Sequence, residues 1–405
     1  MTAAASEPLI GVINAGSSSL KFSFYEGERR LLTGQVDGLG VRPSASATGP
    51  AGETIAPPDL GTTPPSTPSE VLPAIMPWAR ERLGARQLAA LGHRVVHGGL
   101  RHSRPARVTP ELLAELEALV PLAPLHEPHN LVPIRIAMTL NPDLPQVACF
   151  DTAFHRTASE VEQAFALPYV LYEEGVRRYG FHGLSYEYIS KTLPKVAPEI
   201  ASGRVIVAHL GSGASMCALH GGRSIESTLG FTALDGLPMG TRPGQIDPGV
   251  ILHLITARGM SPAEVQNFLY RDCGLKGLSG ISNDMRELQT SPDPNASFAV
   301  EYFVYRAALN AGMLVAALQG IDALVFTAGI GENSVSIRAR IAERLAWLGI
   351  ALDPVENAKH ALLISRSGTT PVYVVPTDEE LMIAQHTQAL LWSKFSSSPQ
   401  RERAS

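Results

Sequence analysis

Cysteine is scarce in this 405-residue chain, which has only Cys149, Cys217 and Cys273, widely spaced and without a C-x-x-C pair. An odd number of cysteines at such spacings supports neither a disulfide framework nor a zinc site. No apolar run reaches the ~18 residues of a membrane-spanning helix. The first eight residues lack the basic region and apolar core of a secretory signal. We therefore expect a protein of the reducing cytoplasm that has no membrane partner.

A strong excess of charge is also absent, since the net charge is −5 and the sequence pI is about 6.2. This balance gives no general reason to expect a nucleic acid as partner. Hydrophobic residues make up 45% of the chain and charged residues 18%, which is typical of a globular protein. A chain of this length exceeds one ordinary core, so we expect about two or three domains and choose two.

Regular patterns are missing from residues 42–77, where Pro, Ser, Thr, Ala and Gly dominate. This composition predicts an exposed loop, an excursion from the first domain. A flexible linker between domains is the alternative, but regular patterns resume directly afterwards.

A polar turn near the N-terminus, Asn14 to Lys21, stands between two apolar runs. Period-2 alternation on both sides predicts a strand, a tight turn and a second strand. Backbone N–H groups of small residues and the Lys21 ammonium could bind phosphate oxygens. The turn lacks the second glycine and the hydroxyl after lysine that define a Walker loop. An ordinary serine-rich hairpin remains the alternative.

Three buried strands are predicted to end directly at polar or glycine-rich segments. Residues 147–150 precede Asp151, residues 205–208 precede the loop 209–215, and residues 321–326 precede the loop 327–331. Ligands of α/β proteins gather at the carboxyl ends of strands. Together with the N-terminal turn, these small-residue loops favour a nucleotide as ligand, although each one alone could be a simple tight turn.

Helix signals flank these strands. Thr109 is an expected N-cap, and residues 337–348 carry apolar side chains at helical spacing. Thr377 and Glu380 have the spacing of a capping box, which predicts a terminal helix extending to about Trp392.

Two arginines, Arg94 and Arg242, lie in glycine-flanked loops. The guanidinium fork matches a carboxylate or a transferring phosphoryl group. His126 and His182 could donate hydrogen bonds to transition-state oxygens. Structural ion pairs and structural histidines are the alternatives, and the spacing around His126 is not that of a helical zinc motif.

These segments resemble, in order and over nearly the whole chain, the acetate kinase family of acyl phosphotransferases. The matching segments are residues 14–21, 93–99, 126–130, 150–155, 179–185, 209–213, 231–248, 329–333 and 377–381. The resemblance implies two ribonuclease-H-like α/β domains of the actin and Hsp70 type, with the active site in the cleft between them, and a homodimer. We expect the first domain at 1–152, completed by a C-terminal helix at about 381–405, and a nucleotide-binding domain at 153–380.

The resemblance also implies roles for individual residues. Asp151, His182, Arg242 and His126 would be catalytic, and Arg94, Val96, Leu125, Phe181 and Ala233 would bind the substrate. The ATP-binding residues would be Lys21, His209, Leu210, Gly211, Ser212, Gly213, Asp284, Met285, Arg286, Gly329, Ile330, Gly331, Glu332 and Asn333. Asn14 and Glu379 would hold Mg²⁺, with Mn²⁺ as the alternative metal.

The implied reaction transfers a phosphoryl group from ATP to acetate. A carboxylic acid with a pKa of about 4 to 5 is already ionised at neutral pH, so the nucleophile needs no general base. We therefore expect Asp151 to position an arginine, the metal or a water molecule. Catalysis instead requires charge compensation, and each donor could contribute about 3 kcal/mol, roughly a hundredfold in rate.

Two residues depart from the family pattern. Ala233 replaces a pocket-lining proline, which predicts a roomier acyl pocket and measurable use of propionate. Ser212 replaces an asparagine, which could weaken or alter nucleotide binding. A propionate or butyrate kinase of the same family is the nearest alternative function. A non-catalytic nucleotide switch of the actin/Hsp70 type is more remote, since it would not need Arg94, Arg242 and His182.

Overall fold

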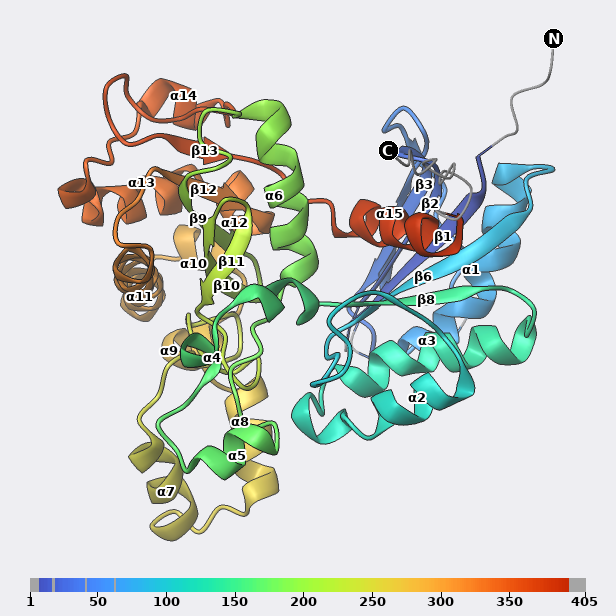
Figure 1. Cartoon of the computed structure of the whole chain (residues 1–405), viewed down its shortest axis with the longest axis horizontal. Coiled ribbons are helices and arrows are strands. Elements are labelled where there is room, and N and C mark those ends of the chain that lie inside the picture. The colour runs from blue at the N-terminus through green and yellow to red at the C-terminus, as the bar shows by residue number, and fades with distance from the viewer. Residues whose placement is uncertain (1–6, 17–18, 41, 62, 393–405) are drawn as a thin grey trace, which may run out of the picture. The chain divides into compact units, whose positions relative to one another are not determined.

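The computed structural model describes residues 7–16, 19–40, 42–61 and 63–392. The chain divides into two compact units (Figure 1). Unit 1 comprises Met1–Ala153 and Asp378–Ser405, and unit 2 comprises Phe154–Thr377. These divisions lie one residue after the first predicted domain boundary and three residues before the second. The part of the predicted C-terminal helix after Trp392 lies outside the described residues.

Unit 1 is built on a sheet in the order β5-β4-β3-β2-β1-β6-β8-β7. Strands β1, β6 and β8 are parallel, whereas β1, β2 and β3 form an antiparallel meander. The strands are β1 (Leu9–Ala15), β2 (Ser19–Glu26), β3 (Arg29–Asp37), β4 (Ser44–Thr48), β5 (Thr54–Ile55), β6 (Leu88–Val95), β7 (Ala106–Arg107) and β8 (Gln146–Phe150). The predicted N-terminal hairpin is confirmed, and Asn14 lies directly opposite Lys21 in it. Residues 17 and 18 of its turn are outside the described residues.

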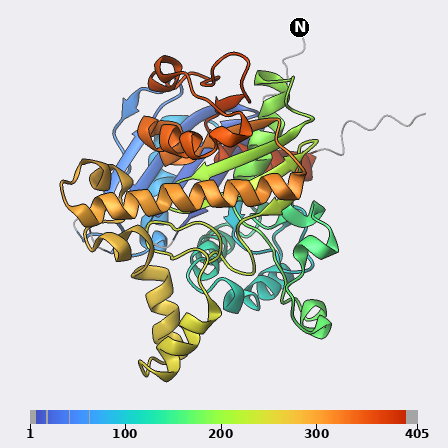
Figure 2. The same cartoon turned by 90° about the vertical axis from the view of Figure 1, so that its left-hand side faces the viewer.

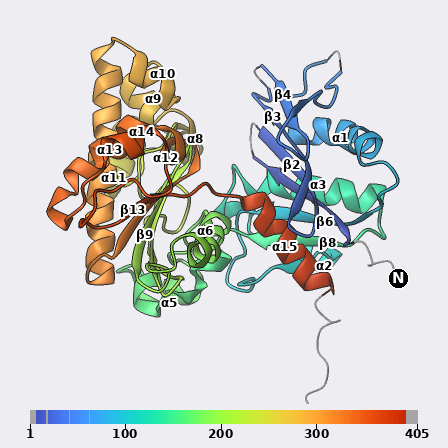
Figure 3. The same ribbon diagram turned by 90° about the horizontal axis from the view of Figure 1, so that it is seen from above.

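Helices cover both faces of this sheet (Figures 1 and 3). The helices are α1 (Pro68–Leu83), α2 (Pro110–Glu117), α3 (Glu127–Leu140) and α15 (Glu379–Trp392), with a 3-10 turn at Val120–Leu122. Leu9 and Ile13 pack in one cluster with side chains of α1. A Cβ added to Gly92 on β6 would meet Ile383 of α15. Since successive strand residues alternate between faces, Asn14, Gly92 and Arg94 all belong to the α15 face.

The expectation of a loop at 42–77 is wrong. Residues 44–48 form β4, which pairs with β3, and α1 begins at Pro68. Val71, Ile75 and Trp78 of α1 are buried against the first sheet. Two prolines inside the helix, Pro73 and Pro77, oppose helix formation locally. Burial of the apolar face outweighs this local preference.

The predicted helix start at Thr109 is confirmed, because its side chain accepts a hydrogen bond from the Leu112 N–H. The predicted capping box at Thr377 and Glu380 is wrong. The Leu381 N–H instead donates to Asp378 Oδ1 at 2.9 Å, so Asp378 caps α15. Thr377 is committed elsewhere, since its hydroxyl is 2.9 Å from that of Ser185.

Unit 2 repeats the arrangement of the five inner strands of unit 1. Its sheet has the order β11-β10-β9-β12-β13. Strands β9, β10 and β11 form an antiparallel meander, and β9, β12 and β13 are parallel. The strands are β9 (Arg204–Leu210), β10 (Ala214–His220), β11 (Arg223–Ser227), β12 (Ala323–Thr327) and β13 (Val372–Val374). The same order, β3-β2-β1-β6-β8, occurs in unit 1. The predicted class of two similar α/β units is thus confirmed.

The helices of unit 2 lie on both faces of its sheet and also beyond it (Figures 1 and 2). They are α4 (Glu160–Gln163), α5 (Tyr169–Glu173), α6 (Gly183–Val196), α7 (Pro248–Thr256), α8 (Pro262–Arg271), α9 (Gly274–Ser279), α10 (Met285–Thr290), α11 (Pro294–Leu318), α12 (Ala328–Asn333), α13 (Val335–Arg344) and α14 (Pro354–Ala358). Tyr186, Ile189 and Leu193 of α6 pack on Val207 and Cys217 of the sheet. The long α11 crosses the other face (Figure 2).

The predicted glycine loop at 327–331 is mostly helical, because α12 begins at Ala328 directly after β12. The helix predicted at 337–348 is interrupted. It consists of α13 and a 3-10 turn at Ala346–Leu348, which Gly349 closes with a φ of 76°. Within residues 7–392, leaving out the undescribed positions, no helix combines the length and apolar character needed to cross a bilayer.

Candidate active site

In unit 1, Arg94 and Asp151 form a buried ion pair at the carboxyl ends of β6 and β8. Arg94 Nη2 lies 2.5 Å from Asp151 Oδ2, and the two side chains are 15% and 1% exposed. Although burial alone would lower the pKa of Arg94, the Asp151 carboxylate raises it above its ordinary value. The sequence-based expectation that Asp151 would position an arginine is consistent with this contact.

Asn14 brings the N-terminal hairpin to the start of α15. Its Nδ2 donates to Glu380 Oε1 at 3.0 Å and to Glu379 Oε2 at 3.4 Å. Lys21, opposite Asn14 on β2, is exposed. The amide oxygen of Asn14 and the two carboxylates are hard oxygen ligands, the kind that Mg²⁺ takes together with substrate phosphates. No cluster of three or more His, Cys, Asp or Glu side chains suited to a metal occurs in the described part of the chain.

The start of α3 supports this region through two residues that the sequence analysis missed. Asn130 Oδ1 accepts the Val96 N–H at 2.9 Å, and Asn130 Nδ2 donates to the Ala15 carbonyl at 2.6 Å. Asn130 therefore connects β1 to the segment after Arg94. In this segment the sequence predicted site roles only for Leu125 and His126, although the acid and the amide beside them, Glu127 and Asn130, were a further signal.

Glu127 is the second missed residue. It is fully buried, and its Oε2 accepts the His97 N–H at 3.2 Å. Its Oε1 has no hydrogen-bond partner among the described residues. Burial, opposed by this hydrogen bond, raises the pKa of Glu127 to about 8. The carboxyl group is therefore mostly protonated at neutral pH.

In unit 2, His182 lies at the start of α6 with a φ of 57°. Its Nδ1 is 2.8 Å from the hydroxyl of Ser215, and that hydroxyl is 2.5 Å from the hydroxyl of Tyr186. Its ring stacks on that of His209, with centroids 4.3 Å apart. His209 and Ser215 are direct partners in the β9-β10 ladder, which explains why both reach the same helix.

Gly213 brings Arg242 close to His182. A Cβ on Gly213 would lie 2.9 Å from Arg242 Nη2 and 3.2 Å from His182 Nε2. Both nitrogens therefore lie next to the position that a Cβ would occupy. Any residue larger than glycine at position 213 would require these side chains to shift. Arg242 Nη1 donates to the Ala233 carbonyl at 2.8 Å, a contact that the sequence did not indicate.

His155 supports the turn that carries Phe181 and His182. It is buried, with its Nδ1 2.8 Å from the Ser224 hydroxyl and its Nε2 2.9 Å from the Phe181 carbonyl. Burial lowers the pKa of His155 to about 4. Gly180 passes so close that a Cβ would lie 2.6 Å from the His155 ring. The sequence analysis did not identify His155 as part of the site.

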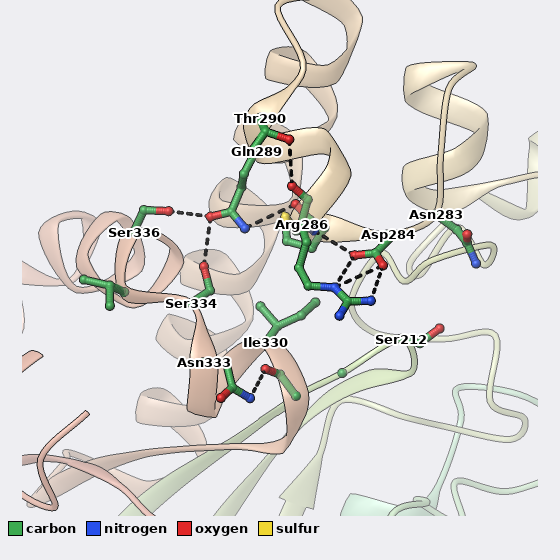
Figure 4. Close-up of a pocket in the computed structure, with 14 residues that line it drawn as sticks. Ser212, Asn283, Asp284, Arg286, Gln289, Thr290, Ile330, Asn333, Ser334 and Ser336 are labelled. Carbon is green, nitrogen blue, oxygen red and sulfur yellow. Dashed lines mark hydrogen bonds and ion pairs between the residues drawn. The ribbon is translucent and has the colours of Figure 1, made fainter. Parts of the chain in front are cut away.

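A cavity of about 820 Å³ opens in unit 2 between the β9-β10 turn, α10 and the segment 329–336 (Figure 4). Its lining includes eight residues predicted to bind ATP: Gly211, Ser212, Asp284, Met285, Arg286, Gly329, Ile330 and Asn333. Asn283, Gln289, Thr290, Ser334, Val335 and Ser336 also line it and were missed. These lie one to four residues beyond segments that the resemblance had marked. The volume suits a ligand of nucleotide size.

Other predicted ATP-binding residues do not line this cavity. His209, Gly213 and Gly331 are close in sequence to residues that line the cavity. Lys21 belongs to unit 1. Leu210 is completely buried in β9. The Glu332 carboxylate accepts the N–H groups of Ala328 at 2.8 Å and Thr377 at 3.1 Å. These two hydrogen bonds fix the backbone directly after β12 and at Thr377, the last residue of unit 2.

The predicted acyl-pocket residues come from both units. Val96 and Leu125 lie in unit 1, and Phe181 and Ala233 lie in unit 2. Val96 and Phe181 are buried, and the other two are partly buried. His126 is the residue directly before α3.

Comparisons with known proteins agree on one family. The sequence profile of the acetokinase family matches residues 9–385. The chain is 64% identical to an acetate kinase of Nitrobacter hamburgensis, over 97% of this chain and 99% of the relative. It is 54% identical to one of Rhizobium meliloti, over 94% and 98%. Among solved structures it resembles a propionate kinase of Francisella tularensis, with a TM-score of 0.87, 36% identity and coverage of 94% and 99%. It also resembles an acetate kinase of Porphyromonas gingivalis, with a TM-score of 0.83, 35% identity and coverage of 95% and 100%.

Proposed function

Because the chain belongs to the acetokinase family, we propose that it transfers the γ-phosphoryl group of ATP reversibly to acetate, giving ADP and acetyl phosphate. The observation that carries this proposal in the molecule is the approach of Arg242 and His182 around Gly213. The β9-β10 turn that contains Gly213 also contains Gly211 and Ser212, which line the nucleotide-sized cavity. Donors beside a bound polyphosphate are what phosphoryl transfer to an anionic acceptor requires.

Unit 2 supplies the nucleotide and the transferring group in this mechanism. The cavity lined by Ser212, Asp284 to Arg286 and the start of α12 takes ATP. Arg242 and the Nε2 of His182 donate to the oxygens of the γ-phosphoryl group. These donors bind the γ-phosphoryl oxygens most strongly in the transition state, where charge redistributes. They therefore lower the barrier, and no proton has to leave the nucleophile.

Unit 1 supplies the acceptor. Arg94, oriented by Asp151, binds the carboxylate. His126 is proposed to assist His182 and Arg242 in stabilising the transferring group. Val96 and Leu125 of unit 1 and Phe181 and Ala233 of unit 2 are the residues proposed to bind the acetate methyl group. Asp151 cannot be a useful general base, because the acetate is already ionised. Its part is to orient Arg94 and to compensate its charge.

Asn14 and Glu379 are the proposed metal environment, with Lys21 beside the nucleotide phosphates. The oxygen-donor set fits Mg²⁺, which usually binds one or two carboxylates together with substrate phosphates. When bound, the metal neutralises phosphate charge. Glu380 shares the Asn14 amide with Glu379 and is a further candidate for this environment. A homodimer in the cytoplasm is the proposed assembly and location.

The decisive test is ADP formation by the purified protein with Mg-ATP and acetate, with hydroxylamine to trap the acyl phosphate. We expect acetate-dependent turnover that falls about a hundredfold or more in Arg242→Ala, the loss typical of one transition-state donor. Arg258→Ala removes an arginine from unit 2 outside the described site and is the matched control. Turnover without any carboxylate dependence, or an active Arg242→Ala protein, contradicts the proposal.

Propionate is a second candidate substrate. Ala233 offers a smaller side chain than proline at the pocket, and a structural relative is a propionate kinase. Parallel assays with acetate, propionate and butyrate rank the three. One methylene is typically worth about 1–3 kcal/mol in such a pocket, so we expect a graded preference.

A further inference from the structure

Two residues outside the predicted catalytic set determine which nitrogen of His182 carries its proton. Tyr186, one turn along α6, and Ser215 on β10 are both completely buried. The Tyr186 hydroxyl is 2.5 Å from the Ser215 hydroxyl, which is 2.8 Å from His182 Nδ1. We propose that Ser215 and Tyr186 are positioning residues that hold neutral His182 with its proton on Nε2. The position of the proton is argued from the hydrogen bonds alone. Its use in phosphoryl transfer rests on the proposed function.

The direction of the chain of hydrogen bonds follows from counting protons. Burial raises the pKa of Tyr186 well above its ordinary value, so the phenol is protonated. Among the described residues, its hydroxyl has Ser215 Oγ as its hydrogen-bond partner. A buried O–H without an acceptor is costly, so Tyr186 donates to Ser215.

The Ser215 proton is then directed in turn. Its hydroxyl has two hydrogen-bond partners within the described ranges, Tyr186 and His182. Since Tyr186 occupies Ser215 Oγ as a donor, the Ser215 proton goes to His182 Nδ1. Nδ1 is therefore an acceptor, and the proton of the neutral ring must be on Nε2.

This arrangement suits the place that Nε2 faces. A Cβ on Gly213 would lie near both His182 Nε2 and Arg242 Nη2. A second positive charge beside a guanidinium is unfavourable, so a neutral donor is the better complement to Arg242. His182 thereby offers an N–H to a phosphoryl oxygen without having to be an imidazolium.

Several other groups face this assembly and must be considered in a pH experiment. His209 on β9 stacks on His182, and Arg242 approaches its Nε2. Around Tyr186 lie His155, whose ring meets it edge-on, and Cys217. Burial lowers the pKa of His155 to about 4 and raises that of Cys217 to about 12. Neither changes charge between pH 6 and pH 8.5. His209 remains in every variant and cancels when rates are compared as a ratio.

The direct test is ¹⁵N NMR of the full-length protein with labelled histidine, with the His182 signals assigned by His182→Gln. We expect a protonated Nε2 and an unprotonated Nδ1 at pH 8. The opposite tautomer overturns the inference. This measurement needs no substrate, so a wild-type protein that lacks acetate turnover would contradict the proposed function and leave the tautomer result intact.

The kinetic test uses Ser215→Ala, which removes the hydroxyl that donates to Nδ1, so the neutral ring can carry its proton on either nitrogen. When the ring is an imidazolium, Nε2 carries a proton in either protein. When the ring is neutral, only the wild type holds the proton there. The ratio of kcat for Ser215→Ala to kcat for the wild type should therefore fall as pH rises from 6 to 8.5, by roughly fivefold, the factor for one hydrogen bond.

Tyr188→Phe is the matched control, since Tyr188 lies on the same helix and takes no part in this chain of hydrogen bonds. Its ratio to wild type should stay constant with pH. Tyr186→Phe leaves the Ser215 hydroxyl in place to donate to Nδ1 and should show a smaller decrease than Ser215→Ala. KM for ATP should change little, because the tautomer acts on the transferring group. A pH-independent ratio for Ser215→Ala overturns the inference.

Discussion

The polar groups of the two units are held in place in different ways. In unit 1, Arg94 and Asp151 form a buried ion pair, and both interact electrostatically with the buried acid Glu127. In unit 2, the hydroxyls of Tyr186 and Ser215 and the ring of His182 form a neutral chain. Removing one member of a buried ion pair leaves a charge without compensation, whereas a neutral chain loses mainly geometry. Substitutions in unit 1 should therefore affect stability and its pH dependence, and those in unit 2 should affect kcat.

The strongest test of this difference is Asp151→Asn, which removes the counter-charge of Arg94 with little change in volume. We expect a loss of about 3–5 kcal/mol in the free energy of unfolding, measured by urea denaturation, together with loss of turnover. Glu379 and Glu380 also favour the Arg94 charge and should keep the loss toward the lower end. The double variant with Arg94→Met should recover stability but not activity. A single variant as stable as the wild type contradicts the comparison.

Glu127→Gln tests the pH dependence in unit 1. The pKa of Glu127 is raised to about 8 in the folded protein by burial, against an ordinary value of 4.5. The folded state therefore binds the extra proton, so this stabilisation is complete below the unfolded pKa and is lost as pH rises through 8. From pH 6 to pH 9 the wild type should lose on the order of 3 kcal/mol relative to Glu127→Gln.

Urea denaturation of both proteins at several pH values measures this difference. Glu117→Gln, at an exposed acid of α2, is the matched control and should follow the wild type. A difference between Glu127→Gln and wild type that does not vary with pH would show that the carboxyl group does not titrate in this range.

Gly213→Ala tests the opposite expectation for unit 2. The new Cβ would lie 2.9 Å from Arg242 Nη2 and 3.2 Å from His182 Nε2, so these side chains must move. A displacement near 1 Å can cost roughly a hundredfold in rate, and we expect this loss in kcat with little change in the melting temperature. Gly312→Ala on α11, outside the described site, is the control, since its Cβ would meet only Trp347 at an ordinary contact distance of 3.7 Å. A large loss of stability in Gly213→Ala would remove the distinction between the units.

The smallest effect concerns acyl selectivity. Ala233→Pro should narrow the pocket and shift the ratio of kcat/KM for acetate over propionate by about tenfold toward acetate, within the range for one methylene. Competing assays with the two carboxylates measure this ratio. If it does not change, the smaller side chain of Ala233 is not what admits propionate.

Much of the fold could be predicted from local signals. Alternation identified the N-terminal hairpin, and short apolar runs identified β8, β9 and β12. The 42–77 segment could not be predicted in this way. Its α1 contains Pro73 and Pro77, and its apolar face is stable only because β1 to β3 cover it. The failed capping box has a similar origin, since Thr377 bonds to Ser185, 192 residues away.

The same contrast between local signals and tertiary contacts applies to the candidate site. The sequence by itself determined the motifs, and through them the family, the arginines and the glycine loops, because each motif is a short run of unusual composition. Only the tertiary structure decided that Asp151 holds Arg94, that Asn130 connects β1 to Val96, and that Ser215 and Tyr186 act on His182. His182 and Ser215 are 33 residues apart along the chain, and Asn130 and Ala15 are 115 residues apart. Such partners are brought together only when parallel strands and a helix face place them at one edge, and no local pattern of residues encodes that distance.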